Sequence, residues 1–114
     1  MQEIEKIDVS CLSRNQQIVL FIARRQNYGV TTRDMVNRFR LNVKYLQRVL
    51  YQLMGKYYIT RKLSAEGEND RSQRGRPPYL YFPTREGVKY INYILDREGL
   101  QKLKVPMPPP STGY

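Results

Sequence analysis

The sequence contains no histidine, no tryptophan and only one cysteine, Cys11. Without histidine, the chain lacks the side chain that most often serves as general base or metal ligand in proteins. A single cysteine can form neither an intrachain disulfide nor a zinc site built from several thiolates. We therefore expect no metal, no cofactor and no catalytic residue, and we interpret the chain as a binding protein rather than an enzyme.

Long apolar runs are also absent, because the longest covers only residues 18–23. A helix that crosses a bilayer needs about 20 predominantly apolar residues. The start of the chain, Met-Gln-Glu-Ile-Glu-Lys, is polar and acidic, which is not typical of a signal peptide. The sequence therefore predicts a protein that neither crosses a membrane nor is secreted.

Acidic side chains are scarce where basic ones are dense. The 114 residues carry 20 Lys and Arg against 10 Asp and Glu, and residues 14–62 hold eleven of these bases with a single acid, Asp34. One acid among so many bases allows few ion pairs within helices. We therefore expect a surface that binds a polyanion, with nucleic acid as the first candidate. The alternative is that these side chains only solvate helix faces.

Hydrophobic spacing and helix-capping residues predict a series of short elements in one domain. The first helix begins at Ser10 or Ser13 and ends at residues 27–29, where Gly29 suits a left-handed cap, and Gly55 is expected to close the third helix. The other expected elements are an extended link at 30–31, helices at 32–39 and 43–54, strands at 57–63 and 79–82, and a helix capped by Thr84.

The third helix has an apolar stripe and a polar face without acids. The stripe follows the i, i+3, i+4, i+7 spacing of a buried helix face and consists of Leu46, Val49, Leu50 and Leu53. The opposite face and its flanks combine two cations, two amides and two phenols, which are groups that bind base edges and phosphates. The candidate contact residues of this helix are Lys44, Tyr45, Gln47, Arg48 and Tyr51.

The order of these elements is that of a winged helix-turn-helix domain. We predict an α+β fold, mainly α, with a three-helix core, a two-stranded β-hairpin wing and a C-terminal helix. Residues 1–9 form an N-terminal arm, residues 10–100 the domain, and residues 101–114 a proline-rich tail that we expect to be disordered. A helix about 10–12 Å across fits a major groove about 12 Å wide, so the third helix is the predicted DNA-reading element.

A longer motif supports the same architecture. Residues 74–87 read Arg-Gly-Arg-Pro-Pro-Tyr-Leu-Tyr-Phe-Pro-Thr-Arg-Glu-Gly. This stretch resembles the passage from the wing to the last helix in PadR-like and MarR-like winged-helix transcription regulators, although Phe82-Pro83 stands where leucine usually precedes the threonine. With the upstream helices, the resemblance covers about residues 13–96. It implies that the third helix lies in the major groove and that the wing contacts the flanking backbone or the minor groove.

The wing loop, residues 64–78, contains a motif that also has its own interpretation. Arg74-Gly75-Arg76-Pro77 equals the core of an AT-hook, an extended segment that enters the narrow minor groove of A/T-rich DNA. The alternative is a turn that closes the hairpin with solvated arginines. The candidate DNA contacts of the wing are Arg71, Arg74 and Arg76.

Three acids precede these arginines in the same loop, at Glu66, Glu68 and Asp70. Their i, i+2, i+4 spacing permits a weak divalent-cation site, but no distal Glu follows as in an EF-hand loop. We expect the carboxylates to pair with neighbouring arginines or to face solvent, and we predict no metal site.

Residues outside the third helix are expected to contact the DNA backbone. A helix N-terminus carries N–H groups that favour phosphate, and the second helix starts with two threonines and an arginine. The predicted backbone contacts are Thr31, Thr32, Arg33, Arg40 and Lys62.

Three functions fit a basic winged-helix protein. The first is a homodimeric transcription regulator that binds a specific double-stranded DNA sequence, with the last helix and residues 1–9 as candidate dimer surfaces. The second is non-specific or architectural DNA binding in replication, partition or chromatin, and the third is a winged helix that binds other proteins. We predict the first, with double-stranded DNA and a second copy of the chain as partners, no membrane contact, and a cytoplasmic location at the nucleoid.

Overall fold

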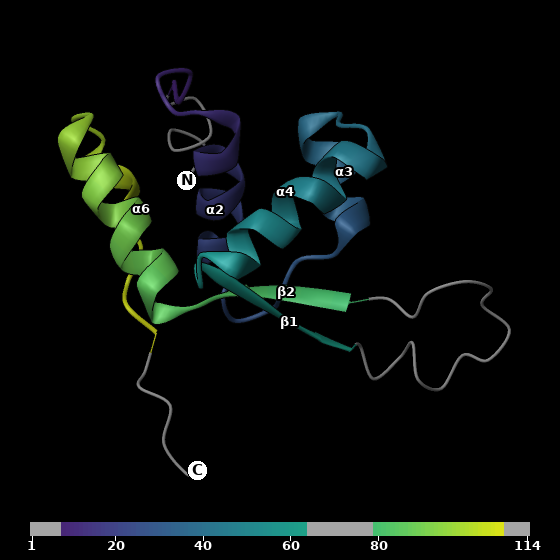
Figure 1. Cartoon of the computed structure of the whole chain (residues 1–114). Coiled ribbons are helices and arrows are strands. Elements are labelled where there is room, and N and C mark those ends of the chain that lie inside the picture. The colour runs from purple at the N-terminus through teal and green to yellow at the C-terminus, as the bar shows by residue number, and fades with distance from the viewer. Residues whose placement is uncertain (1–7, 64–78, 109–114) are drawn as a thin grey trace, which may run out of the picture.

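The computed structural model describes residues 8–63 and 79–108. Most of the predicted arm and the whole wing loop, residues 64–78, lie outside the described residues. The elements follow the predicted order, with the helices packed above a β-hairpin (Figure 1). They are α2 (Arg14–Arg24), α3 (Thr32–Phe39), α4 (Val43–Gly55), β1 (Ile59–Leu63), β2 (Tyr79–Pro83), α6 (Arg85–Arg97) and the 3-10 turn η1 (Gln101–Leu103).

Polar side chains fix the start of each α-helix in the described part of the chain. At α2, the Ser13 hydroxyl accepts the Gln16 N–H at 3.1 Å, and the Gln16 side chain accepts the Ser13 N–H at 2.9 Å. This capping box identifies Ser13, rather than Ser10, as the N-cap residue of α2. The residues that cap the four α-helices are Ser13, Thr31, Asn42 and Thr84.

The hairpin pairs β1 and β2 antiparallel, with Arg61 opposite Tyr81. Val30 forms an additional bridge to Tyr81, with N–H···O distances of 3.0 and 2.8 Å in the two directions. The predicted extended link at 30–31 therefore lies against β2. It ties the start of α3 to the hairpin.

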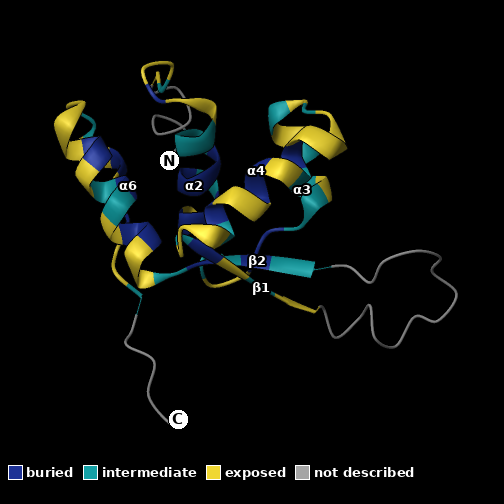
Figure 2. Cartoon of the chain, viewed as in Figure 1, coloured by how far each residue is buried: buried dark blue, intermediate teal, exposed yellow. Residues whose placement is uncertain are grey.

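The hydrophobic core lies where α2 packs against α6 and β2, and α3 and α4 close it from the other side (Figure 2). The predicted stripe of α4 is confirmed, because all four of its apolar residues are buried. The large side chains with almost no exposed surface are Ile18, Ile22, Met35, Leu46, Leu50, Ile91 and Leu95. In the described residues, four α-helices and one antiparallel hairpin make the fold α+β and mainly helical, as predicted.

Gly87 lies in the first turn of α6, where the backbone of Tyr58, the residue before β1, crosses the helix. A Cβ atom at this position would overlap the carbonyl oxygen of Tyr58 and lie 2.9 Å from its carbonyl carbon, which is closer than a side chain can approach. The same carbonyl accepts the Thr84 N–H at 3.0 Å, and the Tyr58 ring stacks on Tyr90 with centroids 4.3 Å apart. The glycine of the Thr-x-x-Gly motif therefore allows α6 to pack directly on the hairpin.

Two helix ends differ from the prediction. α2 ends at Arg24, before residues 27–29, because the Arg25 N–H turns back to the carbonyl of residue 22 at 3.1 Å. α4 continues through Gly55, and the left-handed residue is Tyr57, with φ of 66°. The turn that closes α4 therefore comes two residues later than the glycine suggested, and β1 begins correspondingly later than residue 57.

Residues 100–108, which we call the C-terminal strap, pack against α6, and the side chain of Gln26, just after α2, donates to the Pro106 carbonyl. Leu103 and Val105 are buried in the core, and Asn92 of α6 hydrogen-bonds both backbone groups of Val105. This corrects the expectation of a disordered tail for the described part of that segment. The proline content predicted disorder, but two buried apolar side chains and a side-chain amide that binds the backbone hold the strap in place. Residues 109–114 lie outside the described residues.

Candidate nucleic-acid interface

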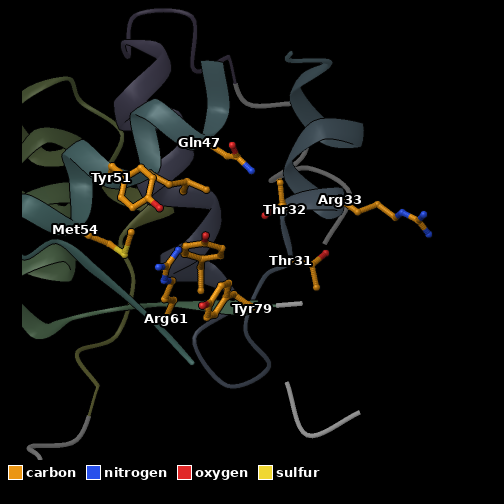
Figure 3. Close-up of a pocket in the computed structure, with 10 residues that line it drawn as sticks. Thr31, Thr32, Arg33, Gln47, Tyr51, Met54, Arg61 and Tyr79 are labelled. Carbon is orange, nitrogen blue, oxygen red and sulfur yellow. The ribbon is translucent and has the colours of Figure 1, made fainter. Parts of the chain in front are cut away.

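An open groove lies between α4, the hairpin and the start of α3 (Figure 3). Its volume is about 560 Å³. Three segments that are distant in sequence supply its walls, and most of the side chains are hydroxylic, amide or cationic. The polar groups that line it are Thr31, Thr32 and Arg33 from the start of α3, Gln47 and Tyr51 from α4, and Arg61, Tyr79 and Tyr81 from the hairpin.

The candidate contact residues of α4 lie on its solvent side. Four of them are exposed, and Gln47 is half-buried at the wall of the groove. The Tyr51 side chain is the most accessible aromatic group of the helix, at 56% exposure. The four exposed residues are Lys44, Tyr45, Arg48 and Tyr51.

The 3.6-residue period of the helix places the five candidate contact residues at three positions around α4. Gln47 and Tyr51 are about one turn apart and face the groove. Lys44 and Arg48 are also about one turn apart and lie on the outward side next to it. Tyr45 lies on the opposite flank from Gln47. The structure therefore brings Gln47 and Tyr51 together with the hairpin, and it places Lys44 and Arg48 beside them on the same exposed surface.

The start of α3 forms another wall of the groove. The Thr31 hydroxyl accepts the Asp34 N–H at 3.0 Å, and the Asp34 carboxylate accepts the Thr31 N–H at 3.1 Å. The N–H groups of Thr32 and Arg33 fall within the first turn, which has no intrahelical acceptors for them. The Arg33 side chain extends away from the other groove residues (Figure 3). This arrangement suits an anion at the end of the helix.

Arg40 lies at the other end of α3, in the turn before α4. It is the C-cap of α3 and has a left-handed backbone with φ of 56°. Its N–H closes the helix by donating to the carbonyl of Val36 at 2.7 Å. The exposed Arg40 side chain is therefore close in sequence to the N-terminus of α4 and does not belong to the groove.

Arg61 is a cationic groove residue that the sequence analysis did not identify, and it also did not identify Tyr79 and Tyr81 of the hairpin. Its guanidinium carbon lies 4.0 Å from the ring centroid of Tyr79 and 5.6 Å from that of Tyr51. Side-chain hydrogen bonding to Tyr81 raises the pKa of Arg61 above its ordinary value, and partial burial of the guanidinium acts weakly in the opposite direction. Strand alternation could have found it, because Arg61 shares a strand face with the buried Ile59.

Lys62 lies on the opposite face of the hairpin from Arg61. Its ammonium nitrogen is 5.4 Å from the ring centroid of Phe82, on the side away from the groove. The structure therefore does not bring Lys62 together with α4. The other predicted wing contacts, together with the acidic cluster of the same loop, lie outside the described residues: Arg71, Arg74, Arg76, Glu66, Glu68 and Asp70.

The charges are distributed unevenly between the two sides of the molecule. Asp34, the single acid of residues 14–62, is engaged in the capping box of α3. Within residues 8–63 and 79–108, the ion pairs all involve α6 or its C-cap: Lys89 with Glu86, Arg97 with Glu98, and Lys104 of the strap with Asp96. The groove and the outward side of α4 therefore form a cationic surface without acidic partners in the described part of the chain.

Two further findings concern alternative kinds of site. In the part of the chain that the structure describes, no group of three acidic or cysteine side chains is placed to hold a metal ion. No helix within the described ranges is long and apolar enough to cross a bilayer.

No protein-family model matches the sequence, and no curated protein matches it at a significant level. Solved structures do match it. The S. aureus MepR–DNA complex superposes with a TM-score of 0.63 at 18% identity, over 89% of this chain and 73% of that chain. A cysteine-to-serine mutant of Lactococcus lactis ZitR gives 0.60 at 14% identity, over 84% and 58% of the two chains. The crystal structure of MarR gives 0.57 at 22% identity, over 81% and 61%.

The fold and the arrangement of helices around the groove define a winged helix-turn-helix protein. Its fold is that of the MarR-like winged-helix proteins, as the resemblance of residues 74–87 implied. The chain spans about three fifths of the length of the MarR and ZitR chains that it matches.

Proposed function

We propose that the protein is a transcription regulator that binds a specific sequence in double-stranded DNA. In this proposal α4 lies in the major groove, and the hairpin lies on the flanking backbone or in the minor groove. The observation that carries the proposal is the acid-free outward side of α4, which adjoins the cationic groove while the ion pairs of the described residues lie around α6. Such a surface attracts phosphate along its length.

The exposed residues of α4 supply groups for reading bases. Arg48 can bind guanine through two hydrogen bonds, and Gln47 can bind adenine in the same way. Lys44 matches a phosphate, and the phenols of Tyr45 and Tyr51 can donate to phosphate or pack on a thymine methyl group. We assign base reading to Gln47 and Arg48 because a side-chain amide offers the donor and acceptor pair that matches adenine, whereas a guanidinium offers two parallel donors that match the two acceptors of guanine.

The flanking residues supply backbone contacts. Thr31, Thr32 and Arg33 place hydroxyl, N–H and guanidinium groups at the start of α3, where a phosphate is favoured. Arg40 adds a cation in the turn before α4. Lys62 adds one on the hairpin face that points away from the groove, so it would contact only backbone that flanks the α4 site. The three wing arginines would enter the minor groove beside the α4 site: Arg71, Arg74 and Arg76.

The similarity to DNA-bound MepR supports this mode of binding. That structure is a protein–DNA complex with the same fold, and it is similar to 89% of this chain. We further propose that the protein acts at the nucleoid as a homodimer, so that two α4 helices read an inverted repeat. The dimer surface would include α6, whose Tyr93 side chain is 59% exposed, and residues 1–9. Light scattering of the protein in solution tests the dimer, and a monomer would contradict it.

Selection of bound duplexes from a randomised pool, at near-physiological salt, tests the function. An enriched inverted repeat is the expected result, and its half-site spacing would measure the separation of the two α4 helices. Enrichment of A/T runs alone would favour architectural binding through Arg74-Gly75-Arg76-Pro77, the motif that motivates this second candidate function. Recovery of no duplex would contradict DNA binding and leave the protein-binding winged helix.

A further inference from the structure

We propose that Arg61 is a positioning residue that links the hairpin to the DNA-facing side of α4 and acts on DNA through Tyr51. This inference rests on the proposed DNA-binding function and adds to it a specific internal contact. It distinguishes Arg61 from the other cations of the surface, which we assign to direct contact with DNA.

The geometry of the guanidinium carries the inference. Arg61 stands on β1, Tyr79 on β2 and Tyr51 on α4, and the cation lies between the two rings at 4.0 Å and 5.6 Å from their centroids. Hydrogen bonding to Tyr81, and less strongly to Tyr51, raises the pKa of Arg61. The guanidinium therefore lies close to the hairpin ring of Tyr79 and within cation–π distance of Tyr51 on α4 (Figure 3).

Arg61 is less accessible to DNA than the residue it holds. The Arg61 side chain is half-buried, whereas Tyr51 is 56% exposed and lies next to Arg48 on the outward side of α4. The guanidinium of Arg61 already lies over the Tyr79 ring. A duplex that approaches α4 therefore meets Tyr51, and the position of Tyr51 depends on Arg61.

Lysine cannot replace arginine in this role. A guanidinium is planar, stacks on aromatic faces and donates in several fixed directions, whereas an ammonium is a compact point charge. The hairpin does not depend on Arg61 for its attachment, because the Val30–Tyr81 bridge holds β2 independently. Variants at Arg61 are therefore expected to fold, but the Tyr51 ring in them is expected to be more mobile.

The first test uses the free protein, so it does not depend on DNA. Arg61→Lys and Arg61→Gln are compared with the unchanged protein by NMR of ¹³C-labelled tyrosine rings. The ring signals of Tyr51 are expected to shift and sharpen in both variants as the ring gains freedom, while those of the distant Tyr93 stay in place. Unchanged Tyr51 signals in both variants would overturn the inference.

The second test measures affinity for the duplex recovered by selection, at several salt concentrations. We expect both Arg61→Lys and Arg61→Gln to weaken binding about tenfold, with the slope of log affinity against log salt unchanged. In a Tyr51→Ala background, Arg61→Gln is expected to have less than a roughly twofold further effect, because the two residues act as one unit. Lys102→Gln, a change of the same charge on the exposed surface of the strap, is the matched control.

The opposite pattern would identify Arg61 as a direct phosphate contact. In that case Arg61→Lys would retain the affinity, and Arg61→Gln would reduce the salt slope by about 0.9. If the unchanged protein retained no duplex at all, the proposed function and the DNA step of this inference would both be wrong. The tyrosine spectra would then still decide whether Arg61 holds Tyr51.

Discussion

The side-chain amide of Asn92 hydrogen-bonds the backbone of Val105 in both directions. Its Nδ2 donates to the Val105 carbonyl, and its Oδ1 accepts the Val105 N–H, each at 2.8 Å. Val105 is buried, and a buried backbone group without a partner is costly. A single side chain on α6 therefore replaces the strand or helix partner that the strap lacks.

Asn92→Ala is expected to lower the free energy of unfolding by about 1–3 kcal/mol, because both backbone groups of Val105 lose their partner. Urea denaturation measures the change. Lys102→Ala, at an exposed position of the same strap, is the control and should change stability by less than about 0.5 kcal/mol. Equal stability of the Asn92→Ala variant and the wild-type protein would mean that these two hydrogen bonds contribute nothing to the stability of the fold.

Gly87→Ala is expected to destabilise the protein by about 3 kcal/mol or more, because its Cβ would collide with the backbone of Tyr58. Gly55→Ala is the matched control, since nothing lies within 4 Å of a Cβ there and the residue is helical. It should leave stability unchanged or raise it by about 0.4–1 kcal/mol. Thermal and urea unfolding measure both changes. Similar stabilities for the two variants would contradict the close packing of α6 on the hairpin.

Alanine variants of the two adjacent threonines at the start of α3 are expected to have different effects, one on stability and the other on DNA binding. Thr31→Ala removes the N-cap and should cost about 0.5–2 kcal/mol of folding free energy. Thr32→Ala leaves the capping box intact, so it should weaken DNA binding with little effect on unfolding. Denaturation and a DNA titration of each variant make the comparison. If Thr32→Ala leaves the affinity for DNA unchanged, the Thr32 hydroxyl does not contact DNA.

Arg48→Ala is expected to cost about 1–3 kcal/mol of DNA-binding free energy and to relax the base preference at one position of the site. A competition titration with single-base variants of the selected duplex measures both effects. Lys44→Ala should instead weaken binding to all sequences alike, because a phosphate contact carries no base information. An Arg48→Ala variant with full affinity and unchanged base preference is the result that contradicts the assignment of α4 as the reading helix.

Local signals in the sequence were sufficient to predict most of the helical fold. The Thr31–Asp34 capping box placed α3 at its observed bounds, and Asn42 placed the start of α4, because a helix start depends on residues within one turn. Helix and strand ends were less predictable. The left-handed conformation falls at Tyr57 rather than at Gly55, which nothing in the neighbouring residues indicates.

Features that depend on distant contacts could not be predicted in the same way. The proline-rich composition of the strap suggested disorder, and only its burial and its contacts with α6 reveal the role of Val105. The candidate residues of α4 do lie on its exposed side or at the groove, because a regular helix fixes the direction of each position. Arg61 was an exception of another kind: it shares a strand face with the apolar Ile59, so strand alternation pointed to it rather than to Lys62, but that signal was not used.

The bridge between Val30 and Tyr81 also sets an order of events during folding. Val30 precedes α3, whereas Tyr81 follows the wing loop, so their two hydrogen bonds close a large loop of the chain. Closing such a loop costs conformational entropy and is slow compared with forming a helix. During synthesis α3 and α4 emerge first, yet the groove does not exist until β2 has emerged and paired. A nascent chain that displays α4 is therefore not yet able to bind DNA in the proposed manner.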